Sequence, residues 1–377
     1  MDRLNRLRVM TILGTRPEII RLSACIKACD AAFDHALCHT GQNYDFELNE
    51  VFFRDLRLRA PDFYLGCAGA HLGETMGNVL AKSYALLSER RPDALLILGD
   101  TNSALCAISA KRLKIPIFHM EAGNRCFDQN VPEEINRRIV DHTADVNLAY
   151  TEHGRRYLLA EGRPAEFTFV TGSPMREVLE QNAEGVEGSG ALEAHGLARN
   201  GYIVLSAHRE ENVDHEGTFL SLMGAVNAVA ETYGLPILFS THPRSRKRIE
   251  ERAFRLHPLV RSLPPFGFHD YVRLQRDAFA VLSDSGTLSE ESAILHFPAV
   301  LLRTSTERPE AVDKGGVVLG GVTEGTVLPA IAMATAPARR AHRAEIPDYA
   351  DADVSNKVVR IIQGYTSLVN RRVWGKS

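Results

Sequence analysis

The chain has 377 residues, of which 45% are hydrophobic and 24% are charged. This length suggests two domains, since a domain typically has about 150 residues, and the ordinary composition excludes the disordered and fibrous classes. The 44 basic residues nearly balance the 47 acidic residues, and the formal net charge of −3 argues against a dedicated nucleic-acid binder. No apolar stretch approaches the roughly 20 residues of a membrane span. We expect a protein without membrane insertion, and we interpret the N-terminus as the approach to a first strand, not a signal peptide.

The first half of the chain alternates short apolar runs with longer amphipathic segments. A strand is predicted at 8–13, and Pro17 suits the first turn of the helix that follows it through residue 27. The further strands predicted in this half lie at 35–40, 93–99, 115–120, 146–149 and 168–171, with a helix at 103–113. Repeated strand–loop–helix units of this kind predict a parallel, doubly wound sheet.

A segment rich in Gly, Ala and Glu at 182–201 interrupts this alternation, which then restarts. The strands predicted beyond it lie at 202–206, 236–240, 278–283 and 299–302, with a helix at 219–233. Two α/β units in tandem follow from this pattern. Because binding sites in such sheets lie beyond the carboxyl ends of the strands, we expect a cleft between two facing units.

Charged and small residues gather at these predicted strand ends. They are Arg16, Asp100 and Glu121 in the first half, and His208, Arg209, His242, Arg244, Ser285 and Gly286 in the second. The cations that could face a diphosphate are Arg16, Arg21, His208 and Arg308. The carboxylates that could serve as general acid and base are Asp100, Glu121 and Glu133. The alternative for the carboxylates is helix capping and salt bridges, for example between Glu133 or Glu134 and Arg137.

The segment SDSGTLSEE at 283–291 has a small-residue turn that opens a helix. Free backbone N–H groups at such a turn suit a pyrophosphate, and Glu291 could accept hydrogen bonds from ribose hydroxyls. The alternative is an ordinary helix N-cap formed by Asp284 or Ser285. Neither GxGxxG nor GxxxxGK[ST] occurs, which argues against a standard dinucleotide fingerprint or a P-loop.

The six cysteines are too sparse for a disulfide scaffold. Cys25 and Cys29 lie four residues apart on a predicted helix, but no matching Cys or His pair completes a metal site. No HExxH spacing occurs either. We therefore expect free thiols, a reducing cytoplasm and no bound metal.

The chain resembles the non-hydrolysing UDP-N-acetylglucosamine 2-epimerases through a series of motifs in family order. The matching segments are GTRPEII (14–20), HTGQNYDFELNEVFF (39–53), LGDTNS (98–103), FHMEAGNR (118–125), VPEEINR (131–137), TGSPM (171–175), SAHREENVD (206–214), STHPR (240–244), SDSGTLSEE (283–291) and TERPE (306–310). The resemblance implies a fold like that of the GT-B glycosyltransferases, with two Rossmann-like domains at 1–180 and 181–353. The second domain would bind UDP, a C-terminal helix at about 354–377 would pack back on the first domain, and the protein would form a homodimer.

The resemblance also implies inversion at C2 of a UDP-linked N-acetylated sugar. UDP is eliminated to give a 2-acetamidoglycal and is then added back on the other face, so no cofactor is needed. The residues that the resemblance makes catalytic are Asp100, Glu121, Glu133 and His208. Those that it implies for substrate binding are Arg16, Arg21, Arg137, Ser285, Gly286, Thr287, Glu291 and Arg308.

Two departures from the better-known members affect the expected substrate. Arg21 stands where those members have lysine, and Thr287 replaces the second glycine of SDSGG. With HTGQNYDFELNEVFF, EAGNRCFD and HREENVD, these departures resemble a subfamily that acts on UDP-linked 6-deoxy-L-amino sugars, such as UDP-N-acetyl-L-fucosamine for capsule or O-antigen synthesis. The alternatives are UDP-N-acetylglucosamine to UDP-N-acetylmannosamine epimerisation, a GT-B glycosyltransferase, and a non-catalytic nucleotide-sugar-binding regulator.

Overall fold

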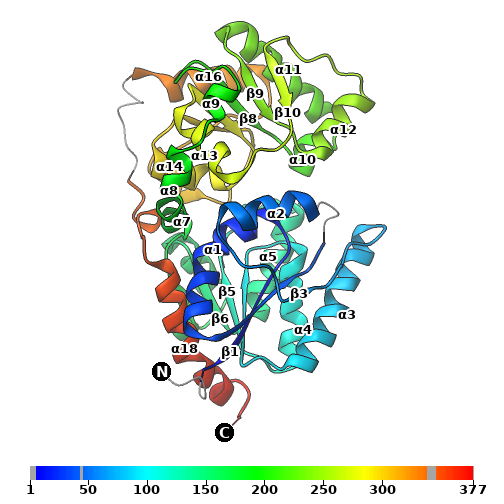
Figure 1. Cartoon of the computed structure of the whole chain (residues 1–377), viewed down its shortest axis with the longest axis vertical. Coiled ribbons are helices and arrows are strands. Elements are labelled where there is room, and N and C mark those ends of the chain that lie inside the picture. Colours follow the sequence, from blue (N-terminus) through cyan, green and yellow to red (C-terminus); the bar gives the residue numbers. More distant parts are fainter. Residues whose placement is uncertain (1–5, 43–45, 338–344, 377) are drawn as a thin grey trace. The chain divides into compact units, whose positions relative to one another are not determined.

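The computed structural model describes residues 6–42, 46–337 and 345–376 (Figure 1). Contacts divide the chain into two compact units. Unit 1 comprises Met1–Gln181 and Asp348–Ser377, and unit 2 comprises Asn182–Pro347. Each unit is built on its own parallel sheet.

Unit 1 contains a seven-stranded sheet in the order β3-β2-β1-β4-β5-β6-β7, with every neighbouring pair of described strands parallel. Its strands are β1 (Arg8–Leu13), β2 (Asp34–His39), β3 (Phe63–Tyr64), β4 (Ala94–Leu98), β5 (Ile117–Met120), β6 (Val146–Ala149) and β7 (Thr168–Val170). Strand β4 is apolar along its whole length, and β4, β5 and β6 are buried throughout, because helices cover both faces of a parallel sheet. The order reverses beside β1, which is the topological switch point at which such sheets bind ligands.

The helices of unit 1 begin with α1 (Arg16–Ala32), whose first turn contains Pro17. The others are α2 (Phe46–Asp55), α3 (Leu72–Arg90), η2 (Asn102–Leu105), α4 (Cys106–Arg112), α5 (Pro132–Thr143), α6 (Glu152–Ala160), η3 (Ala165–Phe167), α7 (Met175–Gln181), η4 (Pro347–Tyr349) and α18 (Val354–Arg372). Helix α18 packs on α1 (Figure 1). The Glu177 carboxylate of α7 accepts hydrogen bonds from the backbone N–H and the hydroxyl of Ser355, at 2.9 and 2.5 Å, and so fixes the start of α18.

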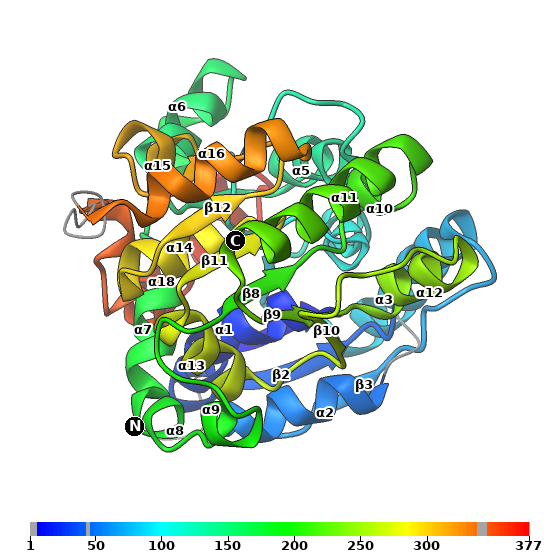
Figure 2. The ribbon, with the colours of Figure 1, turned by 90° about the horizontal axis from the view of Figure 1, so that it is seen from above.

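Unit 2 contains a six-stranded parallel sheet in the order β10-β9-β8-β11-β12-β13. Its strands are β8 (Ile203–Ser206), β9 (Ile237–Ser240), β10 (Val260–Leu263), β11 (Ala280–Ser283), β12 (Ala299–Leu301) and β13 (Val318–Leu319). Its helices are α8 (Ala183–Glu187), α9 (Ala191–Ala194), α10 (Glu210–Val213), α11 (Glu216–Tyr233), α12 (Pro243–Glu251), α13 (Phe268–Asp277), α14 (Thr287–Leu295), α15 (Pro309–Asp313) and α16 (Glu324–Thr335). Helices α11 and α16 pack side by side (Figure 2), and a buried cluster of aliphatic and aromatic side chains joins them to the sheet.

The predicted doubly wound α/β fold is confirmed in both units. The strands β3, β10 and β13 were not predicted, because two of them have only two residues and β10 is a polar edge strand. The Gly-, Ala- and Glu-rich segment contains the short helices α8 and α9. The predicted helix at 103–113 begins as the 3₁₀ turn η2.

The expected free thiols are confirmed: all six cysteines are unpaired with one another, and five of them are buried. Among the described residues, no group of three or more His, Cys, Asp or Glu side chains is arranged to hold a metal ion. Within the same ranges, no helix combines the length and apolar character needed to cross a membrane.

Candidate active site

The carboxyl edge of the unit 1 sheet holds an arginine against a glutamate. Glu121 follows β5 in a left-handed backbone conformation, with φ +64°, and its side chain is buried. Arg21 Nη1 on α1 forms an ion pair with Glu121 Oε2, while Arg21 Nε donates to the Pro17 carbonyl at 3.3 Å. A Cβ at Gly99 would lie 3.0 Å from Glu121 Oε2, so glycine at the end of β4 leaves room for this carboxylate. Arg21 and Glu121, which were each predicted as site residues, are therefore in direct contact.

Asp100 lies at the same edge and is held by helix α5. Arg137 Nε donates to Asp100 Oδ2 at 2.8 Å, and Asn136 donates to the Asp100 carbonyl at 2.9 Å. Arg137 also pairs with the buried Glu134 at 3.1 Å, so a salt bridge on this helix exists beside the contact with Asp100. Glu133 lies half-buried in the first turn of α5. The same helix thus carries Glu133 and positions Asp100.

Glu18, inside the GTRPE motif, was not singled out from the sequence. Its carboxylate is buried and accepts hydrogen bonds from the backbone N–H of Gly14 at 3.1 Å and from the hydroxyl of Thr15 at 2.8 Å. Burial raises the pKa of Glu18 to about 7, although these hydrogen bonds and the charge of Arg21 act in the opposite direction. The turn that precedes Arg16 is therefore fixed by a carboxyl group that titrates near neutral pH. The Arg16 guanidinium itself lies 5.6 Å from the ring centre of Phe52.

Asp284 organises the carboxyl edge of unit 2. Its Oδ2 accepts hydrogen bonds from the backbone N–H groups of His208 and Arg209, at 2.9 and 3.0 Å, and from Asn212 Nδ2 at 3.1 Å. Its Oδ1 lies 3.3 Å from Nδ1 of His208. Asp284 therefore orients the loop that carries His208 and does not cap the following helix.

Helix α14 begins without a side-chain cap. Gly286 is the N-cap, and no side chain caps the helix there, so the alternative of a cap by Asp284 or Ser285 is wrong. Ser285 Oγ instead contacts Thr287 Oγ1 at 3.0 Å. A Cβ at Gly286 would lie 2.3 Å from Glu307 Oε1, so a larger residue at this position would displace the Glu307 carboxylate.

The remaining predicted residues of unit 2 are paired inside the protein. Glu307 contacts Arg209 Nη2 at 3.0 Å and Arg303 Nη1 at 2.5 Å. Arg308 is buried and donates twice to the fully buried Glu290, at 3.0 and 2.7 Å. Glu291, which we expected to meet ribose hydroxyls, accepts a hydrogen bond from Gln275 at 2.6 Å. His242 caps α12 by accepting from the Arg244 backbone N–H, and its ring centre lies 5.7 Å from that of His208.

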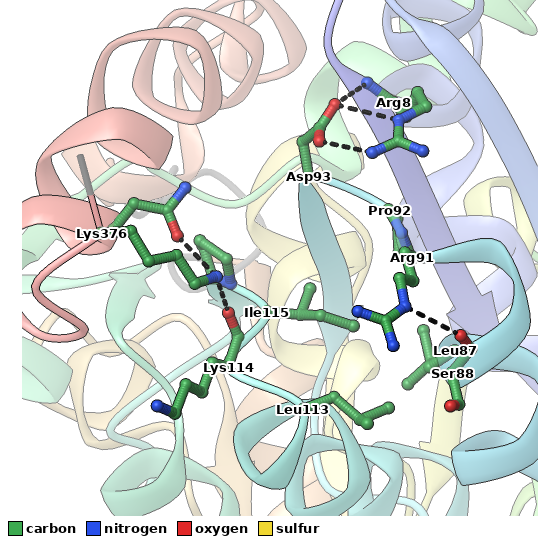
Figure 3. A pocket seen from close by; sticks show the side chains of 12 residues that line it. Arg8, Leu87, Ser88, Arg91, Pro92, Asp93, Leu113, Lys114, Ile115 and Lys376 are labelled. Atoms are coloured by element: carbon green, nitrogen blue, oxygen red, sulfur yellow. Dashed lines mark hydrogen bonds and ion pairs between the residues drawn. The ribbon is translucent and has the colours of Figure 1, made fainter.

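A pocket of about 220 Å³ lies at the opposite, amino-terminal edge of the unit 1 sheet, where β1, β4 and β5 begin (Figure 3). Arg8 pairs with Asp93 on its wall, and Lys376 donates to the carbonyl of Lys114. None of the predicted site residues lines this pocket.

Comparison with known proteins identifies the family. A family model described as UDP-N-acetylglucosamine 2-epimerase matches residues 27–363. The solved UDP-N-acetylglucosamine 2-epimerase of Rickettsia bellii is 45% identical with a TM-score of 0.91, covering 99% of this chain and all of that one. The Methanocaldococcus jannaschii enzyme, solved in complex with UDP-GlcNAc and UDP, is 32% identical with a TM-score of 0.89, covering 95% of this chain and all of that one.

One further relative is named for a different substrate, and another solved protein shares only the fold. The UDP-2,3-diacetamido-2,3-dideoxy-D-glucuronate 2-epimerase of Pseudomonas aeruginosa is 32% identical over 328 residues, which is 85% of this chain and 90% of that protein. A spinosyn rhamnosyltransferase, 13% identical with a TM-score of 0.53 and covering 96% of this chain and 99% of that one, supports the GT-B-like fold alone. The family match over most of the chain and the close structural relatives establish that this protein belongs to the non-hydrolysing UDP-N-acetylglucosamine 2-epimerase family.

Proposed function

We propose that this protein inverts C2 of a UDP-linked 2-acetamido sugar by eliminating UDP and adding it back. A carboxylate removes the C2 proton, the C1–O bond breaks with its electron pair leaving on the β-phosphate, and a 2-acetamidoglycal forms. The β-phosphate oxygen of UDP then bonds to C1 again, while a second carboxyl group, in its protonated form, donates its proton to the opposite face of C2 and becomes a carboxylate. The observation that carries this proposal is a pair of carboxylates at the carboxyl edge of the unit 1 sheet, each bound to an arginine. Glu121 is paired with Arg21, and Asp100 is paired with Arg137.

We assign the C2 proton to Asp100, Glu121 and Glu133 and the diphosphate to a separate cationic set. That set comprises Arg16, His208, Arg308 and the Ser285–Gly286 turn. Preorganised N–H donors and cations stabilise the charge that develops on the departing diphosphate. The uncapped start of α14 supports this assignment because its first backbone N–H groups receive no side-chain cap.

For the sugar, we propose a 6-deoxy-L substrate, with UDP-N-acetyl-L-fucosamine as product for polysaccharide synthesis. Support comes from Arg21, whose planar guanidinium contacts both Glu121 and Pro17, an arrangement that a lysine ammonium does not reproduce. UDP-N-acetylglucosamine is the second candidate, favoured by the names of the Rickettsia bellii and Methanocaldococcus jannaschii relatives.

The test is incubation with each UDP-sugar in deuterated water, followed by NMR. We expect deuterium at C2 and formation of the C2 epimer without any acceptor, and faster exchange with UDP-N-acetyl-L-fucosamine than with UDP-N-acetylglucosamine. Preference for the glucosamine nucleotide would refute the 6-deoxy assignment alone. An unchanged donor that is consumed only with an acceptor would indicate a glycosyltransferase instead.

Variants of the three carboxylates test the assignment of the proton. Asp100→Asn, Glu121→Gln and Glu133→Gln should each lower kcat by about 10²–10⁴-fold while UDP affinity, measured by calorimetry, survives. Glu180→Gln is the control, because it replaces an exposed glutamate on α7 away from the carboxyl edge of the sheet. It should leave both kcat and UDP affinity unaltered. If rate and UDP affinity fall together, these residues have structural roles. Unchanged turnover in all three would remove the proposed acid and base.

A further inference from the structure

Asp141 is a fully buried carboxylate on α5 whose contacts converge on the turn that carries Glu121. Both of its oxygens lie 3.2 Å from the backbone nitrogen of Gly123, which donates to them, and Oδ2 accepts from Arg125 Nη1 at 2.7 Å. Gly123 has φ +82°, and a Cβ there would lie 2.3 Å from the Gly154 carbonyl. One helix side chain therefore holds Gly123 and Arg125, which lie two and four residues after the left-handed Glu121.

His119 extends the contacts of Asp141 to the neighbouring strand end. It is buried on β5, with Nδ1 3.0 Å from Asp141 Oδ1 and Nε2 2.8 Å from the carbonyl of Gly99. Because a carbonyl oxygen only accepts, Nε2 carries a hydrogen and donates it. Gly99 precedes Asp100 directly and gives Glu121 its space. His119 thus links the turn after β4 to the carboxylate that holds the turn after β5.

Helix α5 contacts both the turn after β4 and the turn after β5 from one of its faces. Arg137 and Asp141 are four residues apart, so they lie on the same side of the helix. Arg137 binds the side chain of Asp100, and Asp141 binds the turn of Glu121. A left-handed backbone at a non-glycine residue costs of order 1 kcal/mol and persists only where its surroundings determine it. Asp141 supplies such surroundings for Glu121.

We propose that Asp141 and His119 are positioning residues that hold Glu121 and Asp100 in the geometry required for proton transfer at C2. The inference rests on the proposed function, since it assigns these two carboxylates to the reaction. Although burial alone would raise it, the pKa of Asp141 lies below its ordinary value because His119 and Arg125 favour the ionised form. Asp141 therefore stays a charged acceptor, which an asparagine amide does not replace for all of its donors.

The chain offers a matched control at the other end of β5. Asp145 is also buried, accepts a hydrogen bond from the backbone N–H of Ile117 at 3.0 Å, and pairs with Lys111. It lies at the amino-terminal edge of the sheet, where the pocket of Figure 3 is found. Asp141→Asn and Asp145→Asn therefore each alter a buried carboxylate that accepts a backbone hydrogen bond, but only the first alters the turns of Glu121 and Asp100.

The experiment measures kcat, KM, UDP affinity and melting temperature for the wild type and both variants. Because displacement of a reacting group by about 1 Å can cost about 10²-fold in rate, we expect Asp141→Asn to lower kcat by about that factor. KM and UDP affinity should change little. Asp145→Asn should keep its kcat. His119→Gln, which can keep a donor to Gly99 but loses the facing ring nitrogen, should give an intermediate kcat.

The outcomes separate the two proposals. If the wild type does not exchange the C2 hydrogen of any UDP-sugar tested, the proposed function fails. If the wild type turns over and Asp141→Asn matches Asp145→Asn in kcat, Asp141 only stabilises the fold and the positioning role is refuted. Should Asp141→Asn fail to fold, the kcat of His119→Gln is compared with that of the wild type instead. A wild-type kcat in His119→Gln overturns the inference.

Discussion

Replacing Glu18 with glutamine should change how the stability of unit 1 depends on pH. The carboxyl group is 1% exposed, and burial raises its pKa from 4.5 to about 7 in the folded protein. This gap of about 2.5 units, at about 1.4 kcal/mol per unit, corresponds to about 3 kcal/mol. The value of about 7 already includes the opposing effect of the hydrogen bonds from Gly14 and Thr15.

The sign follows from which state holds the proton. Between about pH 4.5 and pH 7 the folded protein retains a proton on Glu18 that the unfolded chain has released. The stabilising contribution is therefore complete below about pH 4.5 and is lost as the pH rises through about 7. Glutamine does not ionise, so the variant should gain about 3 kcal/mol in unfolding free energy relative to wild type between about pH 4.5 and about pH 8.

Trp374, the single tryptophan of the chain, belongs to unit 1 and reports its unfolding by fluorescence. Denaturant titrations of wild type and Glu18→Gln at several pH values give the difference between their unfolding free energies. The effects of other titrating groups cancel in this difference because both proteins contain them. Glu180→Gln removes an exposed carboxylate of the same unit and should give a flat difference. A flat difference for Glu18→Gln as well would mean that Glu18 is ionised throughout, and the assigned effect of burial would be wrong.

Three further outcomes are expected. Turnover should survive treatment with a chelator and removal of nucleotide, because elimination and re-addition transfer no hydride; loss of turnover that NAD or a metal restores would contradict this mechanism. Gly286→Ala should weaken UDP binding, measured by calorimetry, and lower stability by about 1–3 kcal/mol, because its Cβ would force Glu307 away from its arginines; unaltered binding would remove the turn from the nucleotide site. Glu290→Gln should destabilise unit 2 by about 3–5 kcal/mol in denaturant titrations, since it removes the charge that two Arg308 nitrogens contact; a loss below about 1 kcal/mol would mean that other contacts hold Arg308.

The fold was predictable where strands are buried on both faces. The run ALLIL in β4 and the run IVLS in β8 are continuous apolar segments bounded by turn residues, and each was predicted within two residues of its observed limits. Edge strands lack that signal. In β10, Arg261 and Ser262 are exposed, so the sequence there has neither an apolar run nor a clean alternation.

The candidate site was predictable only in part, because motifs place residues at strand ends but do not reveal their partners. The sequence put Asp100 and Glu121 after adjacent strands, and β4 and β5 are neighbours. It did not identify Asp141 or His119, whose significance depends on contacts between α5 and two turns. Glu18 was also missed, since its environment is set by burial under the GTRPE turn and not by any local pattern.

Arg21 affects the geometry of the carboxyl edge of unit 1 as well as its charge. Its Nε bonds to the Pro17 carbonyl in the first turn of α1, while Nη1 contacts Glu121 after β5. The rigid guanidinium plane therefore fixes the distance between that helical turn and the carboxylate. A lysine ammonium on a flexible stem carries the same charge without this constraint. Because Asn124 also contacts the Glu121 carboxylate, at 3.3 Å, Arg21 and Asn124 together restrict the positions that this carboxylate can adopt.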